Sequence, residues 1–268
     1  MSEFPCDQPV TVNVTMGQGC CIITAEERGS AAVTVEPFKT DRRSAAAAEE
    51  TEVTFDNGQL RIRTPESMTS WLFSRGESKN GAVKITIKVP TGSSASVKTS
   101  SAEVQCHGDI ARANLTSASG PITVARANSV KVNTASGEVH VYECVESGSG
   151  NSASGDIQFD HVGGDLSVKS VSGDVRVGRA DSNVNGNSVS GDISVDSVGG
   201  SSCRLKTVSG SIGVGIPSGT GVWMDLNTVS GTTSSDLAVG DLPGQMEATL
   251  DLRANSVSGN IDLYRTTS

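Results

Sequence analysis

The sequence predicts an all-β fold, a parallel β-solenoid or β-helix built from repeats of about 18 residues. Three copies of one phrase indicate this: S-A-S-G-D-I-Q-F at 152–159, S-V-S-G-D-V-R-V at 170–177 and S-V-S-G-D-I-S-V at 188–195. The repeat glycines are Gly120, Gly137, Gly155, Gly173, Gly191, Gly210, Gly231 and Gly259, with Ala102 in the place of glycine in an earlier copy. A period this regular is typical of a stacked array of like units.

Apolar and polar residues alternate within each copy of the phrase. In the copy at 188–195 one set is Val189, Gly191, Ile193 and Val195, and the other is Ser190, Asp192 and Ser194. Because every second residue of a strand shares a face, we expect one buried face and one wet face. A single copy cannot bury its apolar face alone, so successive copies should stack, with parallel strands paired from coil to coil.

A weaker copy lies between the main ones, since G-G-D-L-S-V at 163–168 resembles the phrase that precedes it. Each unit therefore divides into two halves, each a short strand and a corner. Two sheets follow if one 18-residue unit makes a coil, and three sheets follow if three half-units do. The stronger identity at the longer period favours two sheets, and the general preference of parallel crossovers predicts a right-handed coil.

Composition narrows the class of protein. Aromatic residues make up only 3% of the chain and glycine contributes 30 of 268 residues, which suits narrow coils better than a large globular core. The formal net charge of -9 argues against binding to nucleic acid, because that function needs clustered Lys and Arg.

The N-terminal stretch M-S-E-F-P-C-D has neither the basic nor the apolar region of a signal peptide, and no long apolar run follows. We therefore expect a cytoplasmic chain without a transmembrane segment. Six cysteines fit a reducing compartment. Cys106 and Cys203 occupy apolar positions of the pattern, which predicts small buried side chains.

The chain is expected to divide into an N-terminal β cap of degenerate coils (1–92) and the repeat array with its closing coils (93–268). Strands are predicted at 10–14, 21–23, 33–35, 53–55, 60–62 and 83–89. D-N-G at 56–58 is typical of a hairpin turn, and the alanine run within 39–51 predicts a short helix over the end of the sheet. Such a cap would cover the open edge of the first coil.

An inserted loop at 66–80 contains the apolar cluster Trp71, Leu72 and Phe73. One interpretation is that these side chains fold back and close the end of the coil. The other is a partner-binding loop, because exposed aromatic clusters often mark interfaces. These three residues are therefore candidate binding residues.

The last coils have a second loop at 236–247, within the interval between Gly231 and Gly259. Trp223 and Met224 are expected in the layer that closes the array. The final strand, at 261–264, is expected at its edge, followed by a short polar tail.

Acidic residues recur at one outward position of successive copies, and four of them are candidate binding residues: Glu138, Asp156, Asp174 and Asp192, preceded by Glu103 in an earlier copy. Stacked in register, such carboxylates would lie ~4.8 Å apart, and a Ca²⁺ ion could relieve their repulsion. The simpler interpretation is that each one bonds backbone amides at a turn. Because the calcium-binding nonapeptide pattern is not matched, no Ca²⁺ and no other cofactor is predicted.

No catalytic constellation emerges. Carbohydrate-active β-helix enzymes need clustered carboxylates with a basic residue on one outer face, and no Lys or Arg recurs at matching offsets. His107, His140 and His161 lack metal-ligand spacing, and His140 should point outward between two inward valines. We therefore predict that the protein is not an enzyme.

Several segments together resemble a known family: the repeated V-S-G-D-I-x-V phrase, T-V-N-V at 11–14, L-R-I-R at 60–63, G-V-W-M-D-L at 221–226 and L-D-L-R-A-N-S-V-S-G-N-I-D-L at 250–263. Over almost the whole chain, they are similar to the bacterial adhesin-like β-strand-repeat family, a domain of unknown function, in its leaderless actinobacterial type. The resemblance implies a β-repeat fold and a binding or structural role. It implies no catalytic residues.

The leading hypothesis is a non-enzymatic scaffold or protein-interaction module that binds an unknown protein partner or itself. One alternative is a self-assembling structural element, which good end caps would disfavour. Another is a carbohydrate-active β-helix enzyme, which a smooth outer face without a groove would disfavour.

Overall fold

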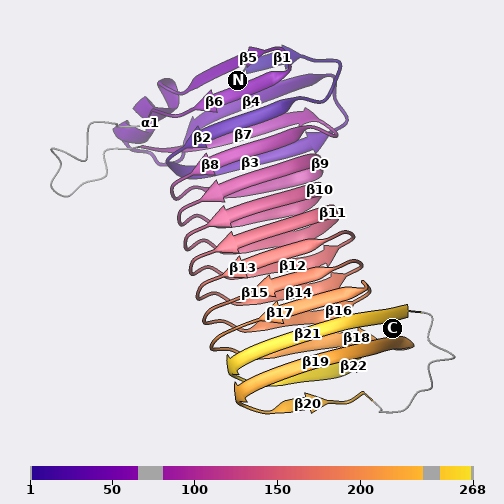
Figure 1. Cartoon of the computed structure of the whole chain (residues 1–268). Coiled ribbons are helices and arrows are strands. Elements are labelled where there is room, and N and C mark those ends of the chain that lie inside the picture. The colour runs from indigo at the N-terminus through magenta and orange to yellow at the C-terminus, as the bar shows by residue number, and fades with distance from the viewer. Residues whose placement is uncertain (1, 66–80, 238–247, 267–268) are drawn as a thin grey trace, which may run out of the picture. The chain divides into compact units, whose positions relative to one another are not determined.

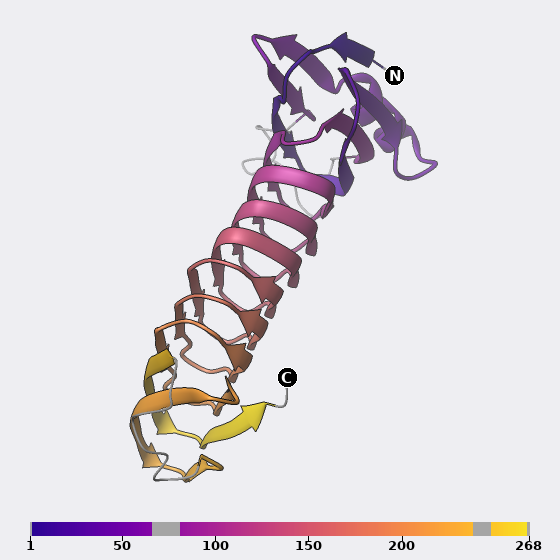
Figure 2. The same ribbon diagram turned by 90° about the vertical axis from the view of Figure 1, so that its right-hand side faces the viewer.

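The computed structural model describes residues 2–65, 81–237 and 248–266, and these contain 22 strands and one helix. They group into two compact units, unit 1 (Met1–Asn128) and unit 2 (Ser129–Ser268). In both units the strands stack on one another as the successive turns of a coil (Figures 1 and 2). The predicted boundary between residues 92 and 93 stays a prediction.

Unit 1 holds the helix and the first strands of the chain. Its elements are β1 (Ser2–Pro5), β2 (Thr11–Met16), β3 (Gln18–Glu26), β4 (Ser30–Pro37), α1 (Arg42–Glu49), β5 (Glu52–Asp56), β6 (Gln59–Arg63), β7 (Ala82–Pro90), β8 (Ser94–Thr99), β9 (Glu103–Ser117) and the first part of β10 (Ile122–Thr134). The expected alternation is clear in β6, where Leu60 and Ile62 are buried and the residues between and beside them are exposed.

The strands of unit 1 form two sheets around an aliphatic core. One has the order β5–β6–β2–β8 and continues into the second half of β9, and the other has the order β1–β4–β7–β3 and continues into the first half of β9. Pairing is parallel except where β1, β4 and β5 join. Each coil gives one strand to each sheet, so the two-sheet prediction is confirmed.

Coil order in unit 1 differs from chain order. The coil made by β2 and β3 lies between the coil of β6 and β7 and the coil of β8 and β9. The first coil to be synthesised is therefore an inner one, and the later segment β4–β7 forms the edge.

Two predicted features of the N-terminal segment, the turn and the helix, are confirmed. The D-N-G turn joins β5 to β6, with positive φ at Asn57 (48°) and Gly58 (72°), the geometry that such a two-residue turn requires. Helix α1 packs on β4 and β7. Asp41 caps its first turn, because Oδ1 accepts a hydrogen bond from the backbone N–H of Ser44 at 2.7 Å.

Unit 2 is built from the remaining strands. They are β11 (Val139–Ser152), β12 (Ile157–Val162), β13 (Leu166–Ser170), β14 (Val175–Ala180), β15 (Val184–Asn187), β16 (Ile193–Val198), β17 (Ser202–Lys206), β18 (Ile212–Pro217), β19 (Thr220–Ser230), β20 (Thr233–Ser235), β21 (Ala248–Ser258) and β22 (Ile261–Thr266). Ile157 pairs with Val175 and Val175 with Ile193, so one coil takes 18 residues.

The two sheets of unit 2 are parallel throughout. Their orders are β11–β13–β15–β17–β21–β19 and β11–β12–β14–β16–β18–β22–β20. The coil of β21 and β22 therefore lies between the coil of β17 and β18 and the coil of β19 and β20. This corrects the expectation that residues 261–264 form the edge. Trp223 and Met224 do lie in the closing layer, on β19.

Residues 188–192 of the repeated phrase form a corner between strands, and this corrects one predicted position: Ile193 and Val195 are buried as expected, but Val189 is not. Ser188 is 7% exposed and Gly191 is buried, whereas Val189 is 47% exposed. Strand alternation does not apply here because the chain turns between β15 and β16. The repeat glycine is required by close approach: a Cβ on Gly155 would lie 2.1 Å from the carbonyl oxygen of Gly137 in the preceding coil.

Buried hydroxyls brace these corners. The backbone N–H of Gly173 donates to Oγ of Ser170 at 2.9 Å, and the backbone N–H of Gly137 donates to Oγ1 of Thr134 at 2.8 Å. Each repeat places Ser or Thr three residues before its glycine, and at Ser170 and Thr134 the side chain satisfies a backbone donor at the turn, whereas Oγ of Ser117, Ser152 and Ser188 has no partner among the described residues.

One coil of unit 2 is packed differently from its neighbours. Phe159 is fully buried at a position where the paired residues are Val141 and Val177. Gly148 and Gly150 face it: a Cβ on Gly148 would lie 3.2 Å from the ring, and one on Gly150 would lie 3.5 Å from it. The two glycines thus provide the volume that the larger ring needs.

Candidate functional site

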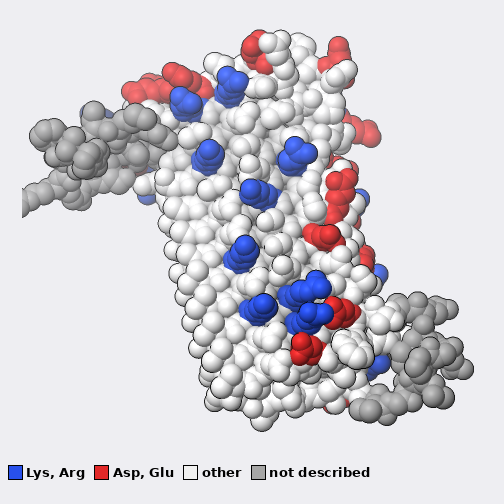
Figure 3. All heavy atoms as spheres, in the orientation of Figure 1, with Lys and Arg blue, Asp and Glu red and all other residues white. Residues whose placement is uncertain are grey.

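The outer face of the sheet formed by β6, β2, β8 and the second half of β9 is cationic. It carries Arg61 and Arg63 on β6, Lys98 on β8 and Arg112 on β9, all exposed. Pairing in register places Asn, Ser, Thr and Gln at the other outward positions of these four strands and no carboxylate among them. Figure 3 shows Lys and Arg spread over this face, with acidic side chains toward its margins. We call these four residues the cationic face of unit 1.

Unit 2 carries a comparable set of cations on β13, β17 and β21. Lys169, Arg204, Lys206 and Arg253 are exposed there. Asp251 neutralises part of this set, because its carboxylate lies 3.2 Å from Arg253 Nε and 3.5 Å from Arg204 Nη2. In the cationic face of unit 1, Arg63 lies opposite Glu52 of the edge strand β5, whereas the outward positions of β6, β2, β8 and the second half of β9 include no acid.

The predicted acidic column becomes a ladder of backbone hydrogen bonds. Oδ1 of Asp156 accepts from the backbone N–H of Asp174 at 2.9 Å, and Oδ1 of Asp174 accepts from that of Asp192 at 3.0 Å. Asp192 in turn accepts from the N–H of Ser211 at 2.7 Å. These three carboxylates therefore fasten one coil to the next at the corner, as the simpler interpretation expected.

The other sequence candidates are not members of this ladder. Glu138 immediately precedes β11, beside the position of Asp156. Glu103 belongs to unit 1, on β9, where it accepts a hydrogen bond from Gln105. Trp71, Leu72 and Phe73 lie outside the described residues, so their binding role stays a prediction.

A second ladder, which the sequence reading missed, occupies the opposite corner of unit 2. Oδ1 of Asp165 accepts hydrogen bonds from Oγ of Ser182 at 2.7 Å and from Nδ2 of Asn183 at 3.0 Å. These donors, led by Ser182, lower the pKa of the Asp165 carboxyl. In the sequence, the G-G-D segment at 163–165 is the feature that could have predicted this ladder.

Two histidine–aspartate pairs also escaped the sequence reading. His140 Nε2 lies 2.9 Å from Asp160 Oδ2, and His161 Nε2 lies 2.8 Å from Asp181 Oδ2. His140 points outward as expected. In both pairs the aspartate follows the histidine by 20 residues, which is one 18-residue coil plus two positions. This spacing is the signal in the sequence that could have predicted the pairs. The hydrogen bond from His161 is the main cause that lowers the pKa of the Asp181 carboxyl.

All six cysteines are free, and all but Cys6 are buried. Burial raises the pKa of the Cys106 and Cys203 thiols to about 12 and that of Cys144 to about 11. Such thiols stay protonated at neutral pH, so they are poor nucleophiles and metal ligands. The prediction that Cys106 and Cys203 are small buried side chains is confirmed, since both are fully buried.

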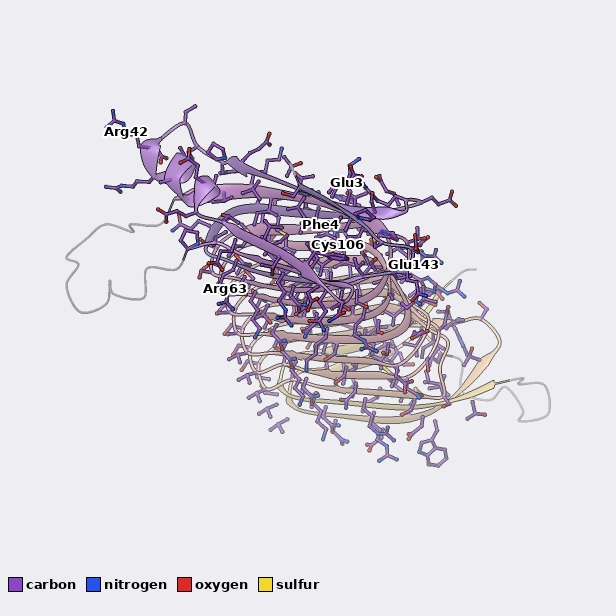
Figure 4. The ribbon with its side chains drawn as sticks, turned by 90° about the horizontal axis from the view of Figure 1, so that it is seen from above. Glu3, Phe4, Arg42, Arg63, Cys106 and Glu143 are labelled. Atoms are coloured by element: carbon purple, nitrogen blue, oxygen red, sulfur yellow. The ribbon has the colours of Figure 1, made fainter. Side chains whose placement is uncertain are left out.

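One hollow of about 520 Å³ lies where α1 begins, with Lys39, Arg42 and Arg43 on one side and Gly81 and Ala82 on the other. Figure 4 shows Arg42 pointing away from the strands. Within the described ranges, no three His, Cys, Asp or Glu side chains gather as a metal site would require. No described helix is long and apolar enough to cross a membrane.

Comparison with solved structures shows similarity in fold. A putative adhesin from Bacteroides fragilis aligns with a TM-score of 0.51 and 14% identity, covering 98% of this chain and 95% of that one. A putative lipid binding protein from Parabacteroides distasonis aligns with a TM-score of 0.47, 14% identity and the same coverage. A putative adhesin from the latter species aligns with a TM-score of 0.38 and 9% identity, covering 97% and 95%.

No curated protein matches the sequence. The profile of one family, Toastrack DUF4097, matches residues 21–264. This range includes the coils of both units and nearly every residue discussed above, and it agrees with the adhesin-like resemblance of the sequence. The chain therefore belongs to the Toastrack DUF4097 family, a family of adhesin-like β-solenoid domains of unknown function.

Proposed function

We propose that the protein is a non-enzymatic, cytoplasmic scaffold whose cationic face of unit 1 binds an acidic surface on a protein partner. The observation that carries this proposal is the segregation of charge. In a chain with a net charge of -9, strands β6, β8 and β9 of one sheet carry four exposed cations, and carboxylates on this face are confined to the edge strand β5, where Glu52 lies opposite Arg63. Solubility does not require that arrangement, because mixed charges serve it equally well.

The geometry of the face suits a protein surface. Its cations lie on a sheet, separated by Asn, Ser and Thr side chains that can both donate and accept hydrogen bonds. The overall negative charge disfavours long phosphate polymers, which would meet repulsion from the rest of the molecule. Complementary charge of this kind raises association rates and selects partners more than it adds affinity.

The non-enzymatic part of the proposal is supported by the state of the candidate catalytic groups. The ladder aspartates accept backbone hydrogen bonds, and the buried thiols stay protonated. All six cysteines are free, which fits a reducing compartment such as the cytoplasm.

Neutralising the cationic face tests the proposal directly. We expect R61Q/R63Q/K98Q/R112Q to abolish salt-sensitive binding to poly-glutamate, used as a stand-in for an acidic protein surface. The matched control, K84Q/K88Q/R176Q/R179Q, changes the net charge equally at other faces and should bind as the unaltered protein does. Equal binding by both variants would contradict the proposal. Tighter binding of the unaltered protein to duplex DNA than to poly-glutamate would contradict it too.

The loop residues Trp71, Leu72 and Phe73 and the acidic residue Glu138 remain candidate binding residues within this scaffold. A folded W71S/L72S/F73S variant belongs in an affinity capture from native lysate beside the cationic-face variant. Loss of one partner with the loop variant alone would assign that partner to the loop. Loss with the cationic-face variant alone would assign it to unit 1's sheet.

A further inference from the structure

The last coil of unit 2 has an open edge. Strand β19 pairs with β21 along its whole length, and β20 pairs with β22. No described strand pairs with their opposite sides. An eleven-residue strand with a free edge presents a row of unpaired backbone N–H and C=O groups, which is a template for another strand.

The side chains of this coil lack the neighbour that inner coils have. Met224 continues the column of Val184, Cys203 and Leu252. Those three are at most 3% exposed, whereas Met224 is 40% exposed. Trp223, on the outward side of the same strand, is 72% exposed, and Val229 at the corner is 84% exposed. Apolar surface therefore accompanies the free backbone groups.

Strand β19 also carries few of the features that block edge pairing. It has no proline or lysine, and Asp225 is its one charged residue. The edge strands of unit 1 differ: β1 has four residues and ends in Pro5, and β5 has five and carries Glu52 and Asp56. Short, charged or proline-containing edges resist strand addition, and β19 is neither short nor strongly charged.

We infer that the β19 edge pairs with the β19 edge of a second copy, antiparallel and about a two-fold axis near Met224. This register places Met224 opposite its own equivalent and Val222 opposite Leu226, so that inward apolar side chains meet across the junction. A register centred on Asp225 would instead put two carboxylates opposite each other.

The second copy is the occupant that the edges favour. A two-fold contact needs one surface only, and β19 supplies backbone groups, apolar inward residues and matching length by itself. The edge strands of unit 1 are poorer partners for β19, because Pro5 in β1 lacks a backbone N–H and β5 carries two carboxylates. The contact is therefore closed, and it produces dimers and not fibres.

Sedimentation equilibrium over a wide concentration range tests the inference. We expect a species of twice the 27.5 kDa chain mass. Met224→Lys should raise the dimer Kd at least about tenfold, because it places a charge at the centre of the junction. Val189→Lys is the matched control, since Val189 is 47% exposed, gains the same charge and lies at a corner away from the edge. A monomer at all concentrations, or a folded M224K dimer of unchanged Kd, would overturn the inference.

Spin-label distances test the symmetry without disturbing the centre. In a Cys6→Ser background, labels at D225C should lie close together across the two-fold axis. Labels at S230C should have attachment points about 40 Å apart, from six residues of extended strand on each side of the axis. Equal distances at the two positions, or no distance between copies, would overturn the antiparallel pairing whatever the behaviour of M224K.

Discussion

The edge of unit 1 at β1 and β5 and the edge of unit 2 at β19 and β20 face the same physical problem. Unit 1 closes its edge with antiparallel strands, a hairpin and α1. Phe4 from β1 and Phe55 from β5 stack with ring centroids 5.2 Å apart, which joins the two sheets over the core (Figure 4 labels Phe4). Unit 2 ends in a parallel strand with the exposed apolar residues Trp223 and Met224.

The difference shows that a coil of this repeat cannot close itself. Its corner aspartates bond to the next coil and its corner glycines lie against a neighbouring coil, so the final coil lacks such a neighbour on one side. Unit 1 solves this by leaving the repeat pattern altogether. Unit 2 keeps the pattern and presents the edge, which is the property of a surface that accepts another strand.

The largest expected effect is the difference in stability loss between a substitution in an inner coil of unit 2 and one at its open edge. Leu252→Ala should lower the free energy of unfolding by about 3 kcal/mol, because Leu252 is fully buried between two coils. Met224→Ala, one coil further in the same column, should cost below about 1 kcal/mol in the monomer. Urea denaturation, at a protein concentration too low for dimers to form, measures both losses of stability. Similar losses would mean that the β19 edge is already covered.

The next effect compares the two edges themselves. Phe55→Ala should cost about 1.5 kcal/mol, since it removes the stacked ring and part of its buried area. Trp223→Ala should change the free energy of unfolding by no more than about 0.5 kcal/mol, because Trp223 is already 72% exposed. Thermal unfolding of the two variants gives the comparison. A larger loss for Trp223 would reverse the assignment of closed and open edges.

A smaller effect is expected at the corners, where the buried hydroxyls should not stabilise every inner coil equally. Ser170 accepts a hydrogen bond from Gly173, whereas Oγ of Ser188, one coil later, has no partner among the described residues. Ser170→Ala should cost about 1 kcal/mol and Ser188→Ala close to zero. Chemical denaturation of both variants measures the difference. Equal costs would show that the hydroxyls act through packing.

The smallest effect is a pH dependence confined to the cap of unit 1. The backbone N–H of Ser44 lowers the pKa of Asp41 below its ordinary value of 3.8. A lowered carboxyl pKa stabilises the fold above the ordinary pKa, and this stabilisation is lost as the pH falls through the folded-state pKa. The difference in Tm between the unaltered protein and Asp41→Asn should therefore be constant above pH 5 and change below pH 4. Parallel pH profiles would contradict the role of the Asp41 charge.

Much of the fold follows from periodicity in the sequence. The glycine spacing predicts two strands per coil, D-N-G predicts the β5–β6 hairpin, and the alanine run predicts α1. These signals are local, so each depends on a few consecutive residues and on backbone preferences that tertiary contacts do not override here.

Features that depend on contacts between coils were missed or misplaced. Val189 was assigned inward because strand alternation was carried through a turn, where it fails. The room that Gly148 and Gly150 leave for Phe159 depends on packing across the core, which no spacing reveals. The cationic face was missed too, because its members lie 2 to 51 residues apart in sequence and meet only through the register of β6, β2, β8 and β9.

The position of β21 and β22 between older coils constrains how unit 2 can fold. Strands β19 and β20 leave the ribosome before the coil that separates them from β17 and β18. Until residues 248–266 emerge, β19 and β20 must either wait without their native neighbour or pair with β17 and β18 and later be displaced. Residues 248–266 therefore insert between strands that precede them in the chain, and this unit cannot fold coil by coil in chain order.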